Sequence, residues 1–126
     1  MAQHFYSAIS EYQAAGSLTV SNTSAPFFAY FTPGAKVVVG KTYRSNSAAF
    51  KSVVSGLEGW ADAFMRRIKY HTPQNGHLSE EYDRDSGVPE GAADLTWSYA
   101  SVLTASFARA QVTGDKNYVK QLANLS

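Results

Sequence analysis

The feature that most constrains this chain is a stripe of apolar residues between positions 47 and 70. Its members recur every three or four residues, which is the spacing of one face of an α-helix. Asn46 or Ser47 is placed to cap the start of such a helix. We therefore expect one long helix, roughly residues 47–70, to organise the fold. The stripe consists of Phe50, Val53, Val54, Leu57, Ala61, Phe64 and Ile68.

Three further segments carry helix signals. Residues 2–15 have apolar side chains at helical spacing. Residues 25–31 form a short apolar piece in which Pro26 suits the first turn of a helix. Residues 93–109 form a third long helix, with Asp94 as its cap or as an acid in its first turn. The expected fold class is all-α, with about three long helices, a short helix and extended loops.

The helix expected at residues 93–109 is unusual because its body is uncharged. Between Leu95 and Ala108 no residue is charged, and apolar or small side chains occur on every face. A helix with this composition is expected to be buried all round. Three long helices and a short one cannot readily enclose it. The chain is therefore expected to belong with more protein than it contains.

Two segments favour an extended backbone. Residues 17–20 are short and extended in character, and Val37-Val38-Val39 is a candidate short strand. The sequence offers no evident partner for this second segment, so an extended loop is the alternative.

Charge and composition exclude several classes of function. The net charge is +1, which gives no electrostatic basis for binding nucleic acid or an anionic membrane. The chain has no cysteine, so neither disulfides nor thiolate chemistry is available. No run is apolar enough to span a bilayer, and the first residues have neither the basic nor the apolar region of a signal peptide.

The histidines do not have the spacing of a metal site. His71 and His77 are six positions apart across a predicted loop, and no cysteine supports them or His4. We therefore expect no metal, and solvated loop histidines instead. The motifs of nucleophilic serine hydrolases, phosphate-binding loops and dinucleotide-binding folds are also missing, so no cofactor is expected.

Carboxylates are the remaining candidates for chemistry. Glu80 and Glu81 are adjacent, and in an extended segment their side chains point to opposite faces. They cannot act together on one bond, so a catalytic carboxylate here needs a partner from elsewhere. A surface acid pair is the alternative. The other charged residues nearby are expected to form a solvated rim: Asp83, Arg84, Asp85 and Glu90.

Several stretches occur in a distinctive order. The most specific are Gly76-His77-Leu78-Ser79-Glu80-Glu81-Tyr82-Asp83, Ser86-Gly87 and Asp94-Leu95-Thr96-Trp97-Ser98-Tyr99-Ala100. Others are Phe5-Tyr6, Gly16-Ser17-Leu18-Thr19-Val20, Ser24 to Phe28, and Trp60-Ala61-Asp62-Ala63-Phe64. Together they resemble the C-terminal part of the catalytic domain of fungal glucoamylases, in one register from residue 3 to about residue 108.

The resemblance implies both a fold and a reaction. Fungal glucoamylases are inverting glycoside hydrolases that release glucose from the non-reducing ends of starch, so the implied partner is starch or a maltooligosaccharide. The implied fold is part of an (α/α)6 toroid of six inner and six outer helices. A secreted location is implied by the family.

The resemblance also assigns residues. Glu80 corresponds to the catalytic base, which must be ionised to activate water. The general acid of an inverting enzyme lies roughly 6.5–9.5 Å from that base. Trp97 corresponds to a tryptophan that walls the pocket beside the glucose ring, and a core aromatic is the alternative role.

The chain departs from the family pattern in two respects. Gly91 replaces a serine whose hydroxyl can bond the base. The family's general acid and sugar-clamping residues lie upstream of the region covered, so the chain is expected to be inactive alone and to need a missing N-terminal portion. Residues 1–110 are assigned to the catalytic domain and residues 111–126 to a divergent polar tail. The alternatives are a non-catalytic saccharide-binding or interaction module, and a truncated product without independent function.

Overall fold

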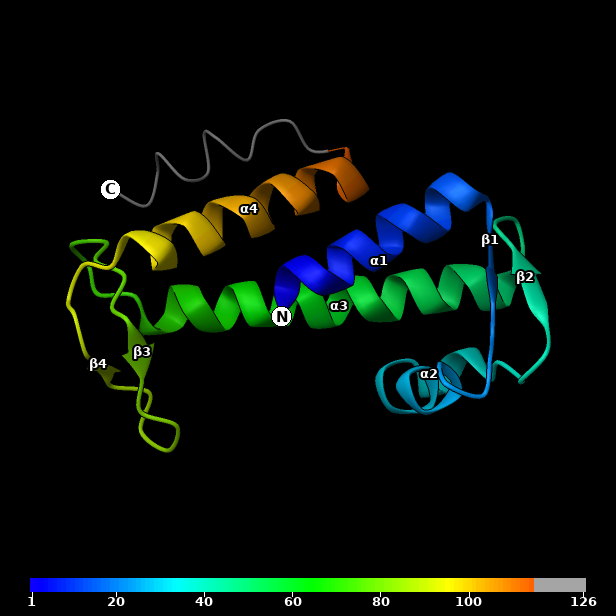
Figure 1. Ribbon diagram of the computed structural model, residues 1–126, viewed down its shortest axis with the longest axis horizontal. Helices are drawn as coiled ribbons and strands as arrows, with labels where there is room; N and C mark the ends of the chain where they lie inside the picture. Colours follow the sequence, from blue (N-terminus) through cyan, green and yellow to red (C-terminus); the bar gives the residue numbers. More distant parts are fainter. Residues whose placement is uncertain (115–126) are drawn as a thin grey trace. The chain divides into compact units, whose positions relative to one another are not determined.

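The computed structural model describes residues 1–114. Within these residues the chain is mostly helical, with two small antiparallel sheets (Figure 1). It divides into two compact units, residues 1–62 and the residues from 63 onward, and the boundary falls inside the longest helix. The helices are α1 (Ala2–Ala15), α2 (Ala25–Phe31), the 3-10 turn η1 (Pro33–Ala35), α3 (Ala48–His71) and α4 (Thr96–Thr113). The strands are β1 (Ser17–Thr19), β2 (Thr42–Arg44), β3 (Glu81–Tyr82) and β4 (Pro89–Glu90).

The helical expectations are confirmed, with shifted boundaries for one helix. Helices α1, α2 and α3 begin and end within a residue of the predicted limits. Ser47, one of two proposed caps, accepts the N–H of Phe50 at 3.2 Å and so starts α3. Helix α4 begins at Thr96 and continues to Thr113, and Leu95 takes the cap position without a side-chain bond. The prediction that Asp94 caps this helix, or lies in its first turn, is therefore wrong.

The strand prediction at residues 37–39 is wrong. The segment that pairs is β2, whose residues Thr42, Tyr43 and Arg44 lie opposite Thr19, Leu18 and Ser17 of β1. Gly40 turns the chain with a φ of 79°, and the valines before it stay about half exposed. Local β-propensity favoured those valines, whereas the partner strand and the turn determine which residues pair.

The first unit is built around the N-terminal half of the stripe on α3. Phe28 of α2 and four residues of α1 are buried in the same unit. The ring of Phe5 lies 4.9 Å from that of Phe31, and Trp60 donates its indole N–H to the Phe31 carbonyl at 3.1 Å. The buried members of this core on α1 and α3 are Ala2, Phe5, Tyr6, Ile9, Phe50, Val53, Leu57 and Ala61.

The second unit contains the β3–β4 hairpin and α4. Only Ala105 and Ser106 of α4 are buried, whereas Trp97, Leu103 and Phe107 are 62%, 43% and 50% exposed. The sequence predicted that this helix would be buried on every face. Residues 1–114 do not bury it in that way. None of the helices described is long and apolar enough to cross a membrane. The proposed tail, residues 111–126, begins inside α4 and from residue 115 lies outside the described residues.

Candidate functional site

Glu80 lies immediately before β3, and its backbone and side chain are both held by one residue. Its N–H donates to the Ala92 carbonyl at 2.9 Å. The Ala92 N–H in turn donates to Glu80 Oε2 at 3.3 Å. The side chain of Glu80 remains exposed. The carboxylate is thus oriented by the backbone and still open to solvent.

Gly91 allows this close approach. Its φ is 72°, a conformation that side-chain-bearing residues rarely adopt. A Cβ at this position would lie 2.7 Å from Glu80 Oε2 and 2.8 Å from Glu80 Cβ. Gly91 has no hydroxyl to bond Glu80, as the sequence indicated. The Ala92 N–H bonds the Glu80 carboxylate, and the glycine at residue 91 leaves room for that carboxylate.

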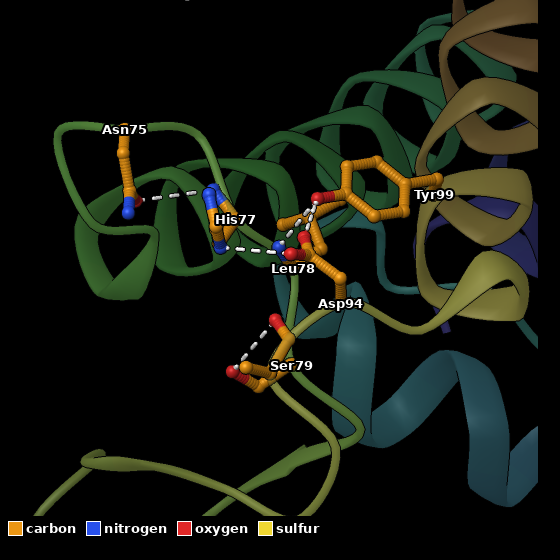
Figure 2. A network of polar contacts seen from close by, with 7 residues as sticks. Asn75, His77, Leu78, Ser79, Asp94 and Tyr99 are labelled. Atoms are coloured by element: carbon orange, nitrogen blue, oxygen red, sulfur yellow. Dashed lines mark hydrogen bonds and ion pairs between the residues drawn. The ribbon is translucent and has the colours of Figure 1, made fainter.

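Leu78 is the first of three residues fixed by the segment leading into α4. Its N–H donates to the hydroxyl of Tyr99 at 3.2 Å, and its carbonyl accepts the N–H of Leu95 at 3.0 Å. The Leu78 side chain is 8% exposed, so apolar packing adds to these bonds. Figure 2 shows the Tyr99 ring reaching from the helix to this backbone.

Ser79 is held from the same side. Its carbonyl accepts the hydroxyl of Ser98 at 2.9 Å, and its own hydroxyl donates to the Ala93 carbonyl at 3.5 Å. We call residues 78–80 together with residues 92–99 the Glu80 clamp. Because each of residues 78, 79 and 80 bonds this second segment, the residues leading into α4 and its first turn hold the backbone that carries Glu80.

Asp94 connects two side chains at the edge of the clamp. His77 Nδ1 lies 2.9 Å from Asp94 Oδ2, and the Tyr99 hydroxyl donates to Asp94 Oδ1 (Figure 2). The bond to Asp94 raises the pKa of Tyr99, against the smaller opposing effect of the Leu78 N–H. His77 lies in a loop and its side chain is 44% exposed, as expected, and it also has Asp94 as a partner. Sequence reasoning missed this trio because its members are distant in the chain and follow no periodicity.

The β3–β4 hairpin follows Glu80 directly. Glu81 lies opposite Glu90, and Tyr82 lies opposite Pro89. At the tip, the Asp83 carboxylate accepts the N–H and the hydroxyl of Ser86, both at 2.6 Å. These bonds lower the pKa of Asp83. The carboxyl group of Asp83 therefore stabilises the turn.

Trp97 is the second residue that the sequence singled out. It lies in the first turn of α4 and is 62% exposed. Within residues 1–114 it takes no part in the hydrogen bonds that hold Glu80. Over the same residues, no three His, Asp or Glu side chains gather in a group that could hold a metal ion.

Comparisons with known proteins agree on one family. Residues 1–107 match the model of the glycosyl hydrolases family 15, and the chain belongs to that family. It is 49% identical over 125 residues to a glucoamylase of Blastobotrys adeninivorans, covering 99% of this chain and 20% of that protein. Glucoamylase 1 of Rhizopus oryzae is 41% identical over 109 residues, covering 86% of this chain and 18% of that protein.

The solved structures extend the match to the fold. The family 15 glucoamylase of Hypocrea jecorina superposes with a TM-score of 0.80 at 40% identity, over 88% of this chain and 18% of that one. The predicted fold class, a helical part of the (α/α)6 fold, is confirmed. The chain spans about a fifth of the length of the curated relatives it matches.

Proposed function

We propose that this chain supplies the catalytic base, Glu80, of an inverting glucoamylase-type hydrolase that releases glucose from starch or maltooligosaccharides. The observation that carries the proposal is the clamp, which fixes three consecutive residues up to Glu80 and leaves its carboxylate exposed. Family membership supplies the reaction class. An oriented and solvent-accessible carboxylate is what a base acting on water requires.

The proposed step uses one oxygen of Glu80 for positioning and the other for chemistry. Oε2 accepts the Ala92 N–H, so Oε1 is the oxygen assigned to the attacking water. As that water attacks the anomeric carbon, its proton passes to Glu80, and the bond from that carbon to the leaving oxygen breaks. A general acid protonates the leaving oxygen from the opposite side of the sugar, roughly 6.5–9.5 Å from the base.

Trp97 is proposed to line the sugar pocket. Its large exposed face suits the apolar face of a glucose ring, and an aromatic ring contributes more contact area than any aliphatic side chain. Substitution by leucine should weaken substrate binding more than it lowers the turnover of bound substrate. The measurement is the separation of KM from kcat in the active chimera described below.

The 126-residue chain is proposed to be inactive by itself, with residues 1–110 acting as part of a larger catalytic domain. The exposed apolar side chains of α4 support this, because they form a surface that further helices of the domain can cover. We expect no glucose release from maltose by the purified chain. Release that is abolished by Glu80→Gln would overturn this part of the proposal.

A chimera tests the role of Glu80 in an active setting. Residues 1–107 would replace the matching segment of the Blastobotrys adeninivorans glucoamylase, to which this chain is 49% identical. Glu80→Gln in the chimera should lower kcat by about 10²–10⁴-fold. Glu81→Gln is the matched control, because it alters the adjacent exposed carboxylate and should leave kcat nearly unchanged. Equal losses in the two variants would contradict the assignment.

A non-catalytic saccharide-binding module is the second candidate. The observation that favours it is the exposed ring of Trp97, which a sugar can reach in this chain alone. The two candidates differ in a simple measurement on the isolated chain. Saturable binding of maltooligosaccharide, lost in Trp97→Leu, together with a chimera whose turnover does not depend on Glu80, would favour the binding module.

A secreted location is proposed as well. Asn22-Thr23-Ser24 is an N-glycosylation sequon, and Asn22 is exposed in the turn between β1 and α2. Expression through a yeast secretory pathway should give a chain that loses mass on endoglycosidase treatment. The Asn22→Gln variant should lose less mass, and equal losses in both proteins would remove this support.

A further inference from the structure

We propose that His77, Asp94 and Tyr99 are positioning residues for Glu80, and that the contact of His77 with Asp94 holds this network in place. The inference rests on the proposed role of Glu80. The side chains of Asp94 and Tyr99, which belong to the clamp, converge with that of His77, which lies just before it (Figure 2). None of them contacts the Glu80 carboxylate, so they act through the backbone that carries it.

The hydrogen bonds of Tyr99 have a fixed direction. A tyrosine hydroxyl has one hydrogen to donate. Because that hydrogen goes to Asp94 Oδ1, the oxygen is left to accept the Leu78 N–H at 3.2 Å. Loss of the Asp94 acceptor would free the hydroxyl to turn. The placement of Leu78 therefore depends on the charge and position of Asp94.

The connection continues from Leu78 to Glu80 through two further residues of the clamp. The Leu78 carbonyl accepts the Leu95 N–H, and two positions later the Glu80 N–H donates to the Ala92 carbonyl. The Ala92 N–H then reaches Glu80 Oε2 at 3.3 Å. A displacement of Leu78 is transmitted through these hydrogen bonds to Ala92. The amide signal of Ala92 therefore reports the position of the Glu80 carboxylate.

His77 holds the network from the loop before the clamp. Asp94 Oδ2 is its side-chain partner at 2.9 Å, and the Tyr99 hydroxyl bonds the other oxygen of the same carboxylate. The His77 backbone N–H donates to the Asn75 side chain at 3.4 Å, which fixes the loop that carries the ring. The His77 ring therefore orients the carboxylate that accepts the Tyr99 hydrogen.

Amide NMR of the 126-residue chain at one fixed pH tests this inference. His77→Ala removes the partner of Asp94 Oδ2, so the Leu78 and Ala92 amide shifts should both move. His77→Gln keeps a side-chain donor and should return both shifts toward those of the unsubstituted chain. His71→Ala is the matched control, because His71 is also a histidine of the second unit but contacts Tyr82 rather than Asp94.

Tyr99→Phe tests the middle step separately. Removing the hydroxyl leaves the Leu78 N–H without its acceptor, so its hydrogen exchange should quicken by roughly tenfold. The Ala92 amide shift should move at the same time. If Tyr99→Phe does not fold, the His77 variants in the loop before the clamp still decide the question.

Two results would overturn the inference: an Ala92 amide shift that does not move in His77→Ala, or one that moves equally in His77→Ala and His77→Gln. Neither result bears on the assignment of Glu80 as the base, which depends on turnover by the chimera. Conversely, a chimera whose turnover is unchanged by Glu80→Gln would exclude the catalytic role of Glu80. The NMR result would still stand, because it does not depend on turnover.

Discussion

At the scale of single residues, Gly91 determines how closely the Glu80 side chain approaches the backbone. Gly91→Ala should destabilise the chain by about 1–2 kcal/mol, because its φ of 72° disfavours a side chain. It should also displace the Glu80 carboxylate, since the new Cβ would lie 2.7 Å from Oε2. Denaturant unfolding measures the first effect, and the Ala92 amide shift measures the second.

Gly40→Ala is the control for this prediction. Gly40 has a similar φ of 79°, but a Cβ there would meet nothing within 4 Å. It should lose comparable stability and leave the Ala92 amide shift unchanged. An unchanged Ala92 shift in Gly91→Ala would show that Glu80 does not pack against this glycine.

Asp83 gives a prediction about acid conditions. Its pKa is lowered in the folded hairpin by the bonds from Ser86 and Asp85. The stabilisation is therefore fully present above the ordinary carboxyl pKa of about 3.9 and is lost as the pH falls through the lowered value. The Ser86 amide should exchange faster as the pH falls through that range, after correction for intrinsic exchange rates.

Asp83→Asn should remove this pH dependence, because an amide cannot titrate. Asp85→Asn serves as the control, since the Asp85 carboxylate is exposed beside Arg84 at 3.8 Å and does not hold the turn. A pH dependence that is the same in Asp83→Asn as in the unsubstituted chain would contradict the assignment.

At the scale of secondary-structure elements, α3 carries two glycines with opposite surroundings. A Cβ at Gly59 would meet nothing within 4 Å, whereas one at Gly56 would lie 2.8 Å from Thr32 Cγ2. Gly59→Ala should therefore stabilise the chain by about 0.5–1 kcal/mol, the gain of alanine over glycine inside a helix. Denaturant unfolding of the two single variants measures the difference.

Gly56→Ala should lack this gain or reverse it. Thr32 is 4% exposed and bonds the Phe28 carbonyl at 3.0 Å, so it cannot move aside freely. Equal stabilisation by both substitutions would mean that α3 and Thr32 are not packed together as described.

The helices and the extended segment at residues 17–20 were predictable from the sequence, whereas β2, β3 and β4 were not, for a physical reason. Helix signals are local, because a stripe such as that on α3 recurs within one segment. Strand pairing is non-local, so the valines at 37–39 looked extended, yet β2 formed at Thr42–Arg44. The β3–β4 hairpin was missed because each strand has only two residues and no alternation to detect.

The same distinction applies to the candidate site. Glu80 could be singled out by resemblance, because it sits in a short continuous motif. Its contacts with Ala92 and Gly91 could not, since they depend on a hairpin that brings residues 80 and 91 together. Asp94 was predicted as a helix cap from its position alone, whereas its bonds to His77 and Tyr99 are tertiary.

At the scale of the whole molecule, α4 exposes apolar side chains that the rest of residues 1–114 does not cover. Such a surface promotes self-association when no partner is present. Leu103→Lys, at a position 43% exposed, should therefore shift the isolated chain toward the monomer in size-exclusion chromatography across a dilution series. Val88→Lys, at a 55% exposed loop position, should have little effect. An unsubstituted chain that is monomeric at every concentration would contradict this expectation.

The central claim is that Glu80 is the base that activates water, and chemical rescue of the chimera tests it most directly. Glu80→Ala should lower kcat by about 10²–10⁴-fold. Azide, a nucleophile that needs no base, should then restore turnover and give the β-glucosyl azide expected from inversion. A Glu80→Ala chimera that retains its activity, or that stays inactive in azide while still folded, would contradict the account.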